Sequence, residues 1–283
     1  MARTGSVNYL LGARFHKMAF VEFGNPAAPA VVCVHGLTRN GRDFDALADA
    51  LADRFHVICP DLPGRGKSEW LPDAMAYQPP SYVVALAHLF AQINKPAALI
   101  GTSLGGICGM MLAAAPGTPL TRLVLNDVGP HIPAAALKRI RDYMAGAPER
   151  FASLPALEAH LRKIHAPFGK LSDAEWAHLT RFSARTVLNQ TGEGGIAMNY
   201  DPKIIEPMRN TVPIDVDTWP LWSLIDMPRL VIRGASSDLL LPDTYDRMVA
   251  SGAEGYVVED AGHAPALMDY ASMARIKAFL MEG

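Results

Sequence analysis

The stretch Pro96-Ala-Ala-Leu-Ile-Gly101-Thr102-Ser103-Leu104-Gly105-Gly106 decides the fold. It opens with a short apolar run typical of a buried parallel strand and leads into residues 104–115, whose small side chains and methionines favour a helix. A Gly-x-Ser-x-Gly match alone is a weak signal, but a strand running into it and a helix leaving it make it specific. The glycines allow a sharp turn that raises the serine hydroxyl at the helix N-terminus. Ser103 is therefore the predicted nucleophile, and a serine that only caps the helix is the alternative.

Length, composition and charge narrow the function classes. The chain has 283 residues, of which 50% are hydrophobic and 19% charged, and its formal charge is −2. This composition is typical of a globular protein with one large core, or with one core carrying an insertion. A nearly neutral chain has no electrostatic attraction to nucleic acid or to anionic lipid. We therefore expect a small-molecule partner, with no nucleic-acid and no membrane partner.

Cysteine usage and the absence of long apolar runs bear on compartment and cofactors. Cys33, Cys59 and Cys108 lie in apolar runs without Cys-x-x-Cys spacing, which indicates reduced core residues and neither a disulfide framework nor a metal site. The first residues lack the apolar stretch of a signal peptide, and no run of about 18 apolar residues occurs. We expect a cytoplasmic protein that needs no cofactor.

Strand-like and helix-like segments alternate along most of the chain. An early strand is predicted at residues 16–24. Buried strands are predicted at 30–34, 57–59, 97–100, 123–125, 230–232 and 256–258, and helices at 43–53, 82–93, 104–115, 243–250 and 270–281. This alternation predicts an α/β fold with a mostly parallel sheet and helices on both faces.

Residues 131–220 have a different character. Prolines are frequent there, no clean buried strand occurs, and residues 134–144, 156–165 and 173–188 are amphipathic with a helical period. We expect this segment to be an inserted helical cap. The predicted domains are a core formed by residues 1–130 and 221–283, and the cap of residues 131–220 between its two parts.

A serine hydroxyl needs a base that takes its proton during attack. His263, in Glu259-Asp-Ala-Gly-His-Ala-Pro, follows the last predicted strand in a glycine-containing loop and is the predicted base. Asp238 ends the run Arg229-Leu-Val-Ile-Arg-Gly-Ala-Ser-Ser-Asp, at the carboxyl end of the penultimate strand, where ligand chemistry collects in open α/β sheets. It is the predicted acid that orients His263. Asp127, after the strand Leu123-Val-Leu-Asn, is its rival.

The chain order Ser103, Asp238, His263 and the motif around Ser103 resemble the α/β-hydrolase fold family over nearly the whole chain outside the cap. The segment Val31-Val-Cys-Val-His35-Gly36-Leu37 is similar to the family's His-Gly segment after the third strand. The segment Asp61-Leu-Pro-Gly64-Arg-Gly66-Lys-Ser68 is similar to its turn after the fourth. The resemblance implies an eight-stranded sheet, a nucleophile elbow at Ser103, and an oxyanion hole formed by the backbone N–H groups of Leu37 and Leu104.

Two nearby motifs are assigned structural roles. His35 follows a buried strand, and we interpret its ring as a support for the oxyanion segment instead of as the base. The residues Gly66-Lys-Ser resemble the end of a phosphate-binding loop, but that motif needs glycine five residues before Gly66, where Asp61 stands. Nucleotide binding is therefore excluded.

The predicted cap contributes aromatic and thioether side chains that suit an apolar pocket. The predicted substrate-binding residues are Tyr143, Phe168, Trp176, Met198 and Tyr200. The alternative is that these side chains pack the cap against the core. Whether Arg39, Asn40 and Arg42 meet a polar acyl group or solvent stays open.

The predicted reaction is acyl transfer from an ester to Ser103 and then to water. The expected substrates are small or medium acyl esters, and lactones and polyester oligomers are left open, as is the oligomeric state. One alternative is a carbon–carbon bond hydrolase of ring-cleavage products with the same triad. Its relatives usually carry a longer Gly/Ser-rich oxyanion loop than the His35-Gly-Leu-Thr found here. The other alternative is a non-catalytic small-molecule-binding member of the fold.

Overall fold

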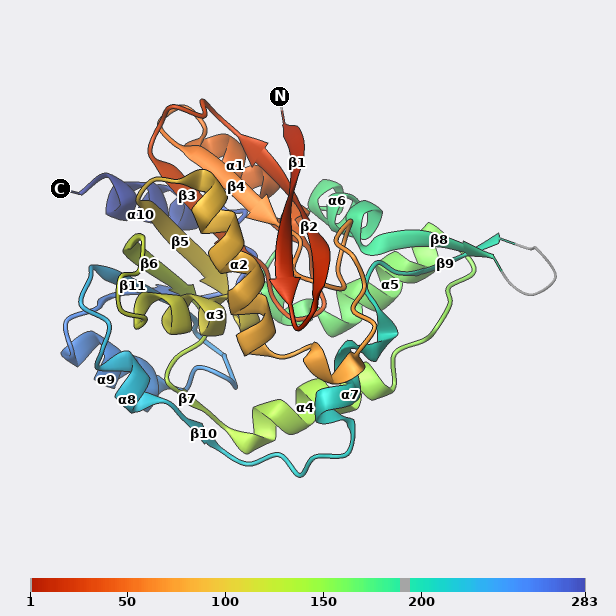
Figure 1. The fold of residues 1–283 in the computed structure, drawn as a ribbon. Helices are drawn as coiled ribbons and strands as arrows, with labels where there is room; N and C mark the ends of the chain where they lie inside the picture. The colour runs from red at the N-terminus through yellow and green to blue at the C-terminus, as the bar shows by residue number, and fades with distance from the viewer. Residues whose placement is uncertain (1, 189–193, 283) are drawn as a thin grey trace.

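A computed structural model describes residues 2–188 and 194–282. Eight strands form one sheet in the order β1-β2-β4-β3-β5-β6-β11-β12 (Figure 1). The strands are β1 (Arg3–Leu11), β2 (Arg14–Phe23), β3 (Ala30–Val34), β4 (His56–Pro60), β5 (Ala97–Thr102), β6 (Leu120–Asn126), β11 (Arg229–Gly234) and β12 (Glu254–Val258). Strand β2 is antiparallel to β1 and β4, and the pairs from β4 across to β12 are parallel. The predicted eight-stranded, mostly parallel sheet is confirmed.

The central strands are apolar on both faces because helices cover both faces. Alternate side chains of a strand point to opposite sides, and in β3 Val32 and Val34 join one apolar cluster while Val31 and Cys33 join the other. The first cluster includes residues of α2 (Pro79–Ile93), α3 (Leu104–Ala113) and α9 (Pro242–Ala250). The second includes residues of α1 (Asp45–Leu51) and α10 (Tyr270–Met281). The core thus consists of two layers separated by the sheet.

The N-terminal edge of the sheet differs from the prediction of one strand at residues 16–24. Strands β1 and β2 form a hairpin around Gly12 and Ala13, with Leu11 paired to Arg14. Only Val7 and Tyr9 of β1 are buried, since an edge strand packs one face. So few apolar positions give a weak sequence signal.

Residues 127–228 lie between β6 and β11, and the described part of this insert adds no strand to the large sheet. It contains β7 (His131–Ile132), α4 (Ala134–Ala145), α5 (Leu154–Ile164), α6 (Asp173–Ser183), β8 (Ala184–Leu188), β9 (Gly194–Met198), α7 (Glu206–Arg209), β10 (Val216–Asp217) and α8 (Trp219–Trp222). Helices α4 and α5 match predicted helices. That the insert is a separate cap domain, residues 131–220, stays a prediction.

One predicted helix of the insert, residues 173–188, is too long. Ser172 and Glu175 form a capping box at the start of α6, which ends at Ser183. Residues 184–188 instead form β8, which pairs with β9 in an antiparallel hairpin that projects from the body (Figure 1). The β-branched Thr186 and Val187 favour a strand there.

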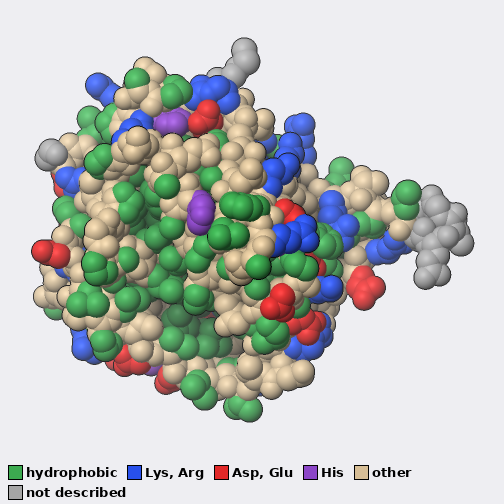
Figure 2. Space-filling model, viewed as in Figure 1, with side chains coloured by type: hydrophobic (Ala, Val, Ile, Leu, Met, Phe, Trp, Pro, Cys, Tyr) green, Lys and Arg blue, Asp and Glu red, His purple; other side chains and the backbone are tan. Residues whose placement is uncertain are grey.

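The surface agrees with the nearly neutral composition. Figure 2 shows basic and acidic side chains interspersed on the face it presents. Among the described helices, none is both long enough and apolar enough to span a bilayer.

Candidate active site

Ser103 occupies a strained turn between β5 and α3. Its backbone has φ 51° and ψ −113°, a conformation that residues other than glycine rarely adopt. A Cβ on Gly105 would lie 2.0 Å from the carbonyl oxygen of Val34, and one on Gly101 would lie 2.5 Å from the backbone of Gly105. Glycine is therefore required at both positions, and the turn can pass close to β3.

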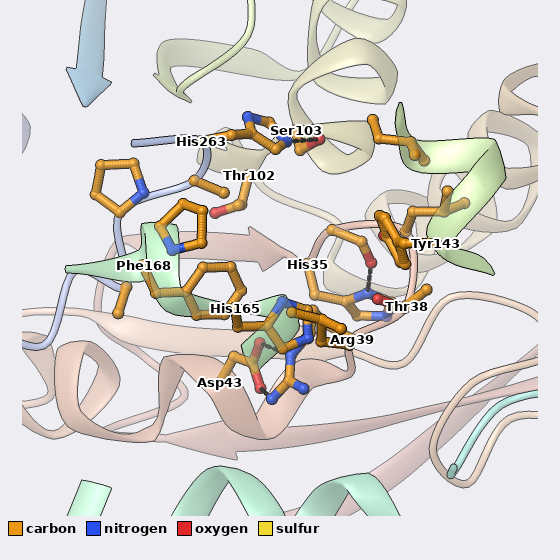
Figure 3. Close-up of a pocket in the computed structure, with 18 of the residues that line it drawn as sticks. His35, Thr38, Arg39, Asp43, Thr102, Ser103, Tyr143, His165, Phe168 and His263 are labelled. Atoms are coloured by element: carbon orange, nitrogen blue, oxygen red, sulfur yellow. Dashed lines mark hydrogen bonds and ion pairs between the residues drawn. The ribbon is translucent and has the colours of Figure 1, made fainter. Parts of the chain in front are cut away.

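The hydroxyl of Ser103 contacts a histidine instead of capping the helix. Ser103 Oγ lies 3.0 Å from Nε2 of His263, which comes from the loop after β12 (Figure 3). The Ser103 side chain makes no capping hydrogen bond to α3. The structure thus brings together two predicted residues 160 positions apart.

The prediction that Asp238 orients His263 is wrong in this structure. Nδ1 of His263 lies 2.7 Å from Oδ2 of Asp127, the rival candidate, whose side chain is fully buried directly after β6. Asp238 instead accepts hydrogen bonds of 2.5 and 2.8 Å from Arg139. The physical reason is the order of the strands: β6 lies next to β5, which carries Ser103, whereas β11 lies one strand further away.

Asp127 lies among hydrogen-bond donors. Its Oδ1 accepts from the backbone N–H of Gly234 at 2.9 Å, and its Oδ2 accepts from Ser237 Oγ at 2.6 Å and from the backbone N–H of Ala264 at 3.2 Å, besides His263. Burying a carboxylate away from water is costly unless such donors replace the water. The region around the end of β11 was expected to contribute the acid itself, Asp238. It instead contributes donors, from Gly234 and Ser237, to the carboxylate of Asp127.

The two residues of the expected oxyanion hole lie near Ser103. Leu104 directly follows Ser103 and is the first residue of α3. Leu37 directly follows Gly36, and a Cβ added to Gly36 would lie 3.9 Å from the Cβ of Ser103. Within the described part of the chain, the backbone N–H groups of Leu37 and Leu104 have no hydrogen-bond acceptor. Both N–H groups are therefore free to bind an oxygen atom.

The ring of His35 supports this segment. Its Nδ1 donates to the carbonyl of Gly36 at 2.7 Å, and its Nε2 accepts from the backbone N–H of Leu62 at 2.9 Å. Burial lowers the pKa of His35 to about 3. The ring is thus neutral, and both of its nitrogens bind backbone groups instead of Ser103.

A pocket beside Ser103 and His263 is lined from the core and from the insert (Figure 3). Tyr143 and Phe168 line it, as predicted. The other predicted substrate-binding residues do not line it. Trp176, Met198 and Tyr200 have exposed fractions of 5%, 6% and 8% and belong to the apolar cluster that continues from the sheet into the insert. For these three, packing of the insert against the core is the role that the structure shows.

The polar lining of the pocket includes residues that sequence reasoning left open or missed. Arg39 is buried in the lining and paired with Asp43, whereas Asn40 and Arg42 lie outside it. Arg139 and His165 were missed, since an exposed helix arginine and a histidine after a helix carry no motif. The ring of His165 stacks on Phe168 with centroids 4.4 Å apart, and burial holds its pKa well below the usual value.

The described residues contain no group of three or more His, Cys, Asp or Glu side chains arranged to hold a metal ion. The site contains a serine hydroxyl, an imidazole and a buried carboxylate that are joined in this order by hydrogen bonds. Two free backbone N–H groups lie next to them. Such an arrangement can activate a hydroxyl as a nucleophile and stabilise an oxyanion.

Comparison with known proteins agrees with this fold. A model of the alpha/beta hydrolase family matches residues 31–276. The 3-hydroxybutyrate-oligomer hydrolase of Cupriavidus necator is 43% identical over 96% of this chain and 95% of its own. The pimeloyl-[acyl-carrier protein] methyl ester esterase of Neisseria meningitidis is 28% identical over 91% of this chain and 95% of its own. The crystal structure of an alpha/beta hydrolase from Novosphingobium aromaticivorans superposes with a TM-score of 0.85 at 35% identity, covering 99% of this chain and 99% of its own. The chain belongs to the alpha/beta hydrolase family.

Proposed function

We propose that the chain is a carboxylic ester hydrolase whose nucleophile, base and orienting acid are Ser103, His263 and Asp127. The observation that carries this proposal is the hydrogen-bond chain from Ser103 Oγ to His263 Nε2, 3.0 Å, and from His263 Nδ1 to Asp127 Oδ2, 2.7 Å. Because a carboxylate can only accept, it holds the proton on Nδ1 and leaves the Nε2 lone pair for the serine proton. This is the tautomer that a general base requires.

The reaction follows from these positions. Ser103 Oγ bonds to the ester carbonyl carbon while His263 takes its proton, and the backbone N–H groups of Leu37 and Leu104 bind the oxyanion. The alcohol leaves with the proton from His263. Water, deprotonated by His263, then releases the acid and restores Ser103. Losing one oxyanion donor of this kind costs about 10²–10³ in rate.

The proposed substrates are esters of short hydroxy acids, including their linear oligomers. The relative that is 43% identical over nearly the whole chain is named for the hydrolysis of 3-hydroxybutyrate oligomers. The pocket lining supports the same class, because apolar Ile140 and Phe168 lie there together with polar Thr38 and Thr102. Such a mixed lining suits a short chain that carries oxygen atoms.

The test replaces Ser103 by alanine. We expect Ser103→Ala to lower kcat for p-nitrophenyl butyrate and for a 3-hydroxybutyrate trimer by at least about 10⁴-fold, because only oxyanion binding and positioning remain. Ser81→Ala, in α2, is the matched control. A fluorophosphonate should label the unmodified protein at Ser103, as read by mass spectrometry.

Three results would contradict the proposal. Full esterase activity in Ser103→Ala would exclude Ser103 as the nucleophile. Cleavage of a coloured dienoate ring-cleavage product without ester turnover would assign a carbon–carbon bond hydrolase. Ligand binding with neither turnover nor labelling would indicate a binding protein.

A further inference from the structure

The two arginines that line the pocket differ in how their charge is balanced. Nε and Nη2 of Arg39 each donate to Asp43 at 2.7 Å, and its Nη1 donates to Ser183 Oγ at 2.8 Å. Asp43 lines the same pocket. This pair therefore adds no net charge to the pocket, and each nitrogen of the Arg39 guanidinium already donates a hydrogen bond.

Arg139 has its counterion outside the pocket lining. Its Nε and Nη2 donate to Asp238 at 2.5 and 2.8 Å, and Asp238, with 49% of its side chain exposed, is not a lining residue. Over the described residues, Nη1 of Arg139 has no hydrogen-bond partner. A guanidinium carries five N–H donors in a planar fork and can bind one carboxylate on each of two edges. Nε and one N–H of Nη2 form the edge that binds Asp238. The other edge, formed by Nη1 and the second N–H of Nη2, has no partner among the described residues.

The residues of α4 that line the pocket beside Arg139, and the rings of His35 and His165, add no positive charge to it. Arg139, Ile140 and Tyr143 line the pocket from α4, as expected because Tyr143 lies about one helical turn after the other two. Burial holds the pKa of His35 and that of His165 below the usual value, so both rings are uncharged at neutral pH. Among the described lining residues, Arg139 is thus the one arginine whose carboxylate partner lies outside the lining.

We infer that the free edge of Arg139 binds a carboxylate of the substrate, and that Asp238 is the positioning residue that holds the guanidinium at the pocket rim. The inference rests on the proposed ester hydrolysis and specifies its substrate. A linear hydroxy acid oligomer has one free carboxylate, on its last unit. When the last ester bond is cleaved, that unit is the leaving alcohol. The enzyme would therefore act preferentially at the acid end and release monomers.

The kinetic test compares two substrates that differ only at this end: the linear 3-hydroxybutyrate dimer as free acid and as its terminal methyl ester. The quantity measured is the ratio of kcat/KM for the acid to kcat/KM for the methyl ester. Arg139→Gln should lower this ratio about 10- to 100-fold, mainly through KM of the acid, because a charge-assisted hydrogen bond is lost. Arg139→Lys should recover part of the ratio, since lysine offers a point charge without the fork.

Two further variants separate positioning from general charge. Asp238→Asn should lower the ratio less than Arg139→Gln, because the guanidinium stays but is held less firmly. Lys138→Gln removes one positive charge from the adjacent position of α4, where Lys138 pairs with Asp142 outside the pocket lining. The ratio of kcat/KM for the acid to kcat/KM for the methyl ester should be the same in Lys138→Gln as in the unmodified protein. An equal ratio in Arg139→Gln, or a preference of the unmodified protein for the methyl ester, would overturn the inference.

A binding experiment keeps this inference separate from the proposed reaction. Calorimetry with the 3-hydroxybutyrate anion needs no turnover, and Arg139→Gln should raise its Kd at least about 10-fold. Retained binding in Arg139→Gln would contradict the carboxylate site even if esters are hydrolysed. Arg139-dependent binding without ester turnover would instead contradict the proposed function alone.

Discussion

The turns after β6 and β11 each place an aspartate at the carboxyl edge of the sheet, and the two carboxylates have opposite environments. The Asp127 side chain is fully buried and accepts from four donors, whereas 49% of the Asp238 side chain is exposed and its partner is Arg139. Burial without water demands that each oxygen be satisfied by protein donors, which fixes a carboxylate in place. A half-exposed carboxylate such as that of Asp238 can also bind water, so it depends less on protein donors.

The two turns also cooperate. The end of β11 donates to Asp127 through the backbone N–H of Gly234, and the turn after it donates through the hydroxyl of Ser237. This turn therefore helps to hold the carboxylate of Asp127. Its own carboxylate, that of Asp238, binds Arg139 at the pocket. The comparison teaches that the carboxyl end of a strand identifies a functional edge, and that neighbours in space then decide the role of each side chain.

The largest effect is expected for Asp127→Asn. An amide can donate to Nδ1 of His263 and so favour the tautomer that cannot accept the serine proton. We expect kcat for an aryl ester to fall about 10⁴-fold, the loss found when such an aspartate is replaced in a serine protease. Circular dichroism checks the fold, and Asp238→Asn is the matched control. A loss below about tenfold would contradict the role of Asp127.

A smaller effect is expected for Gly234→Ala, at the end of β11, which disturbs the contact between Asp127 and His263. A Cβ there would lie 2.1 Å from the carbonyl oxygen of Gly262, next to His263. The loop must move, at a cost of about 1–3 kcal/mol in the free energy of unfolding, and the misplaced imidazole should lower kcat about 10- to 100-fold. Denaturant unfolding and ester kinetics measure both.

The control for that substitution is Gly194→Ala, where a Cβ would meet none of the described residues within 4 Å. It should leave both quantities near those of the unmodified protein. Equal behaviour of the two alanine variants would show that the contact between Gly234 and the His263 loop is unimportant.

The smallest effect is expected for Asp238→Asn. An exposed ion pair contributes at most about 1 kcal/mol to the free energy of unfolding. We expect a change within that limit, and a decrease in kcat for a neutral ester of no more than about threefold. A decrease as large as that of Asp127→Asn would reinstate Asp238 as the orienting acid.

The sheet and two members of the proposed triad could be predicted because their signals are local. The apolar run into Ser103 and the glycines after it describe a strand and a turn within eleven residues, and His263 follows the last strand in a glycine-containing loop. The choice between Asp127 and Asp238 is not local. It depends on β6 lying between β5 and β11, an order that no short segment encodes.

The pocket was predicted less well, for a related reason. Aromatic composition indicates that side chains are buried, but not on which face. Tyr143 and Phe168 point into the pocket, whereas Trp176 packs in the apolar cluster, where the guanidinium of Arg162 lies 5.4 Å from its ring centroid. Arg139 carries no sequence signal at all, since its position follows from the docking of α4 against the core.

The most direct test of the contact between Asp127 and His263 is proton NMR of the imidazole Nδ1–H at low temperature. A proton held between an imidazole and a carboxylate is shielded less than a free one and exchanges slowly when buried, so it gives a resonance far downfield. The account predicts this resonance in the unmodified protein and in Asp238→Asn, and its loss in Asp127→Asn and His263→Gln. A resonance that persists in Asp127→Asn and disappears in Asp238→Asn would contradict the account.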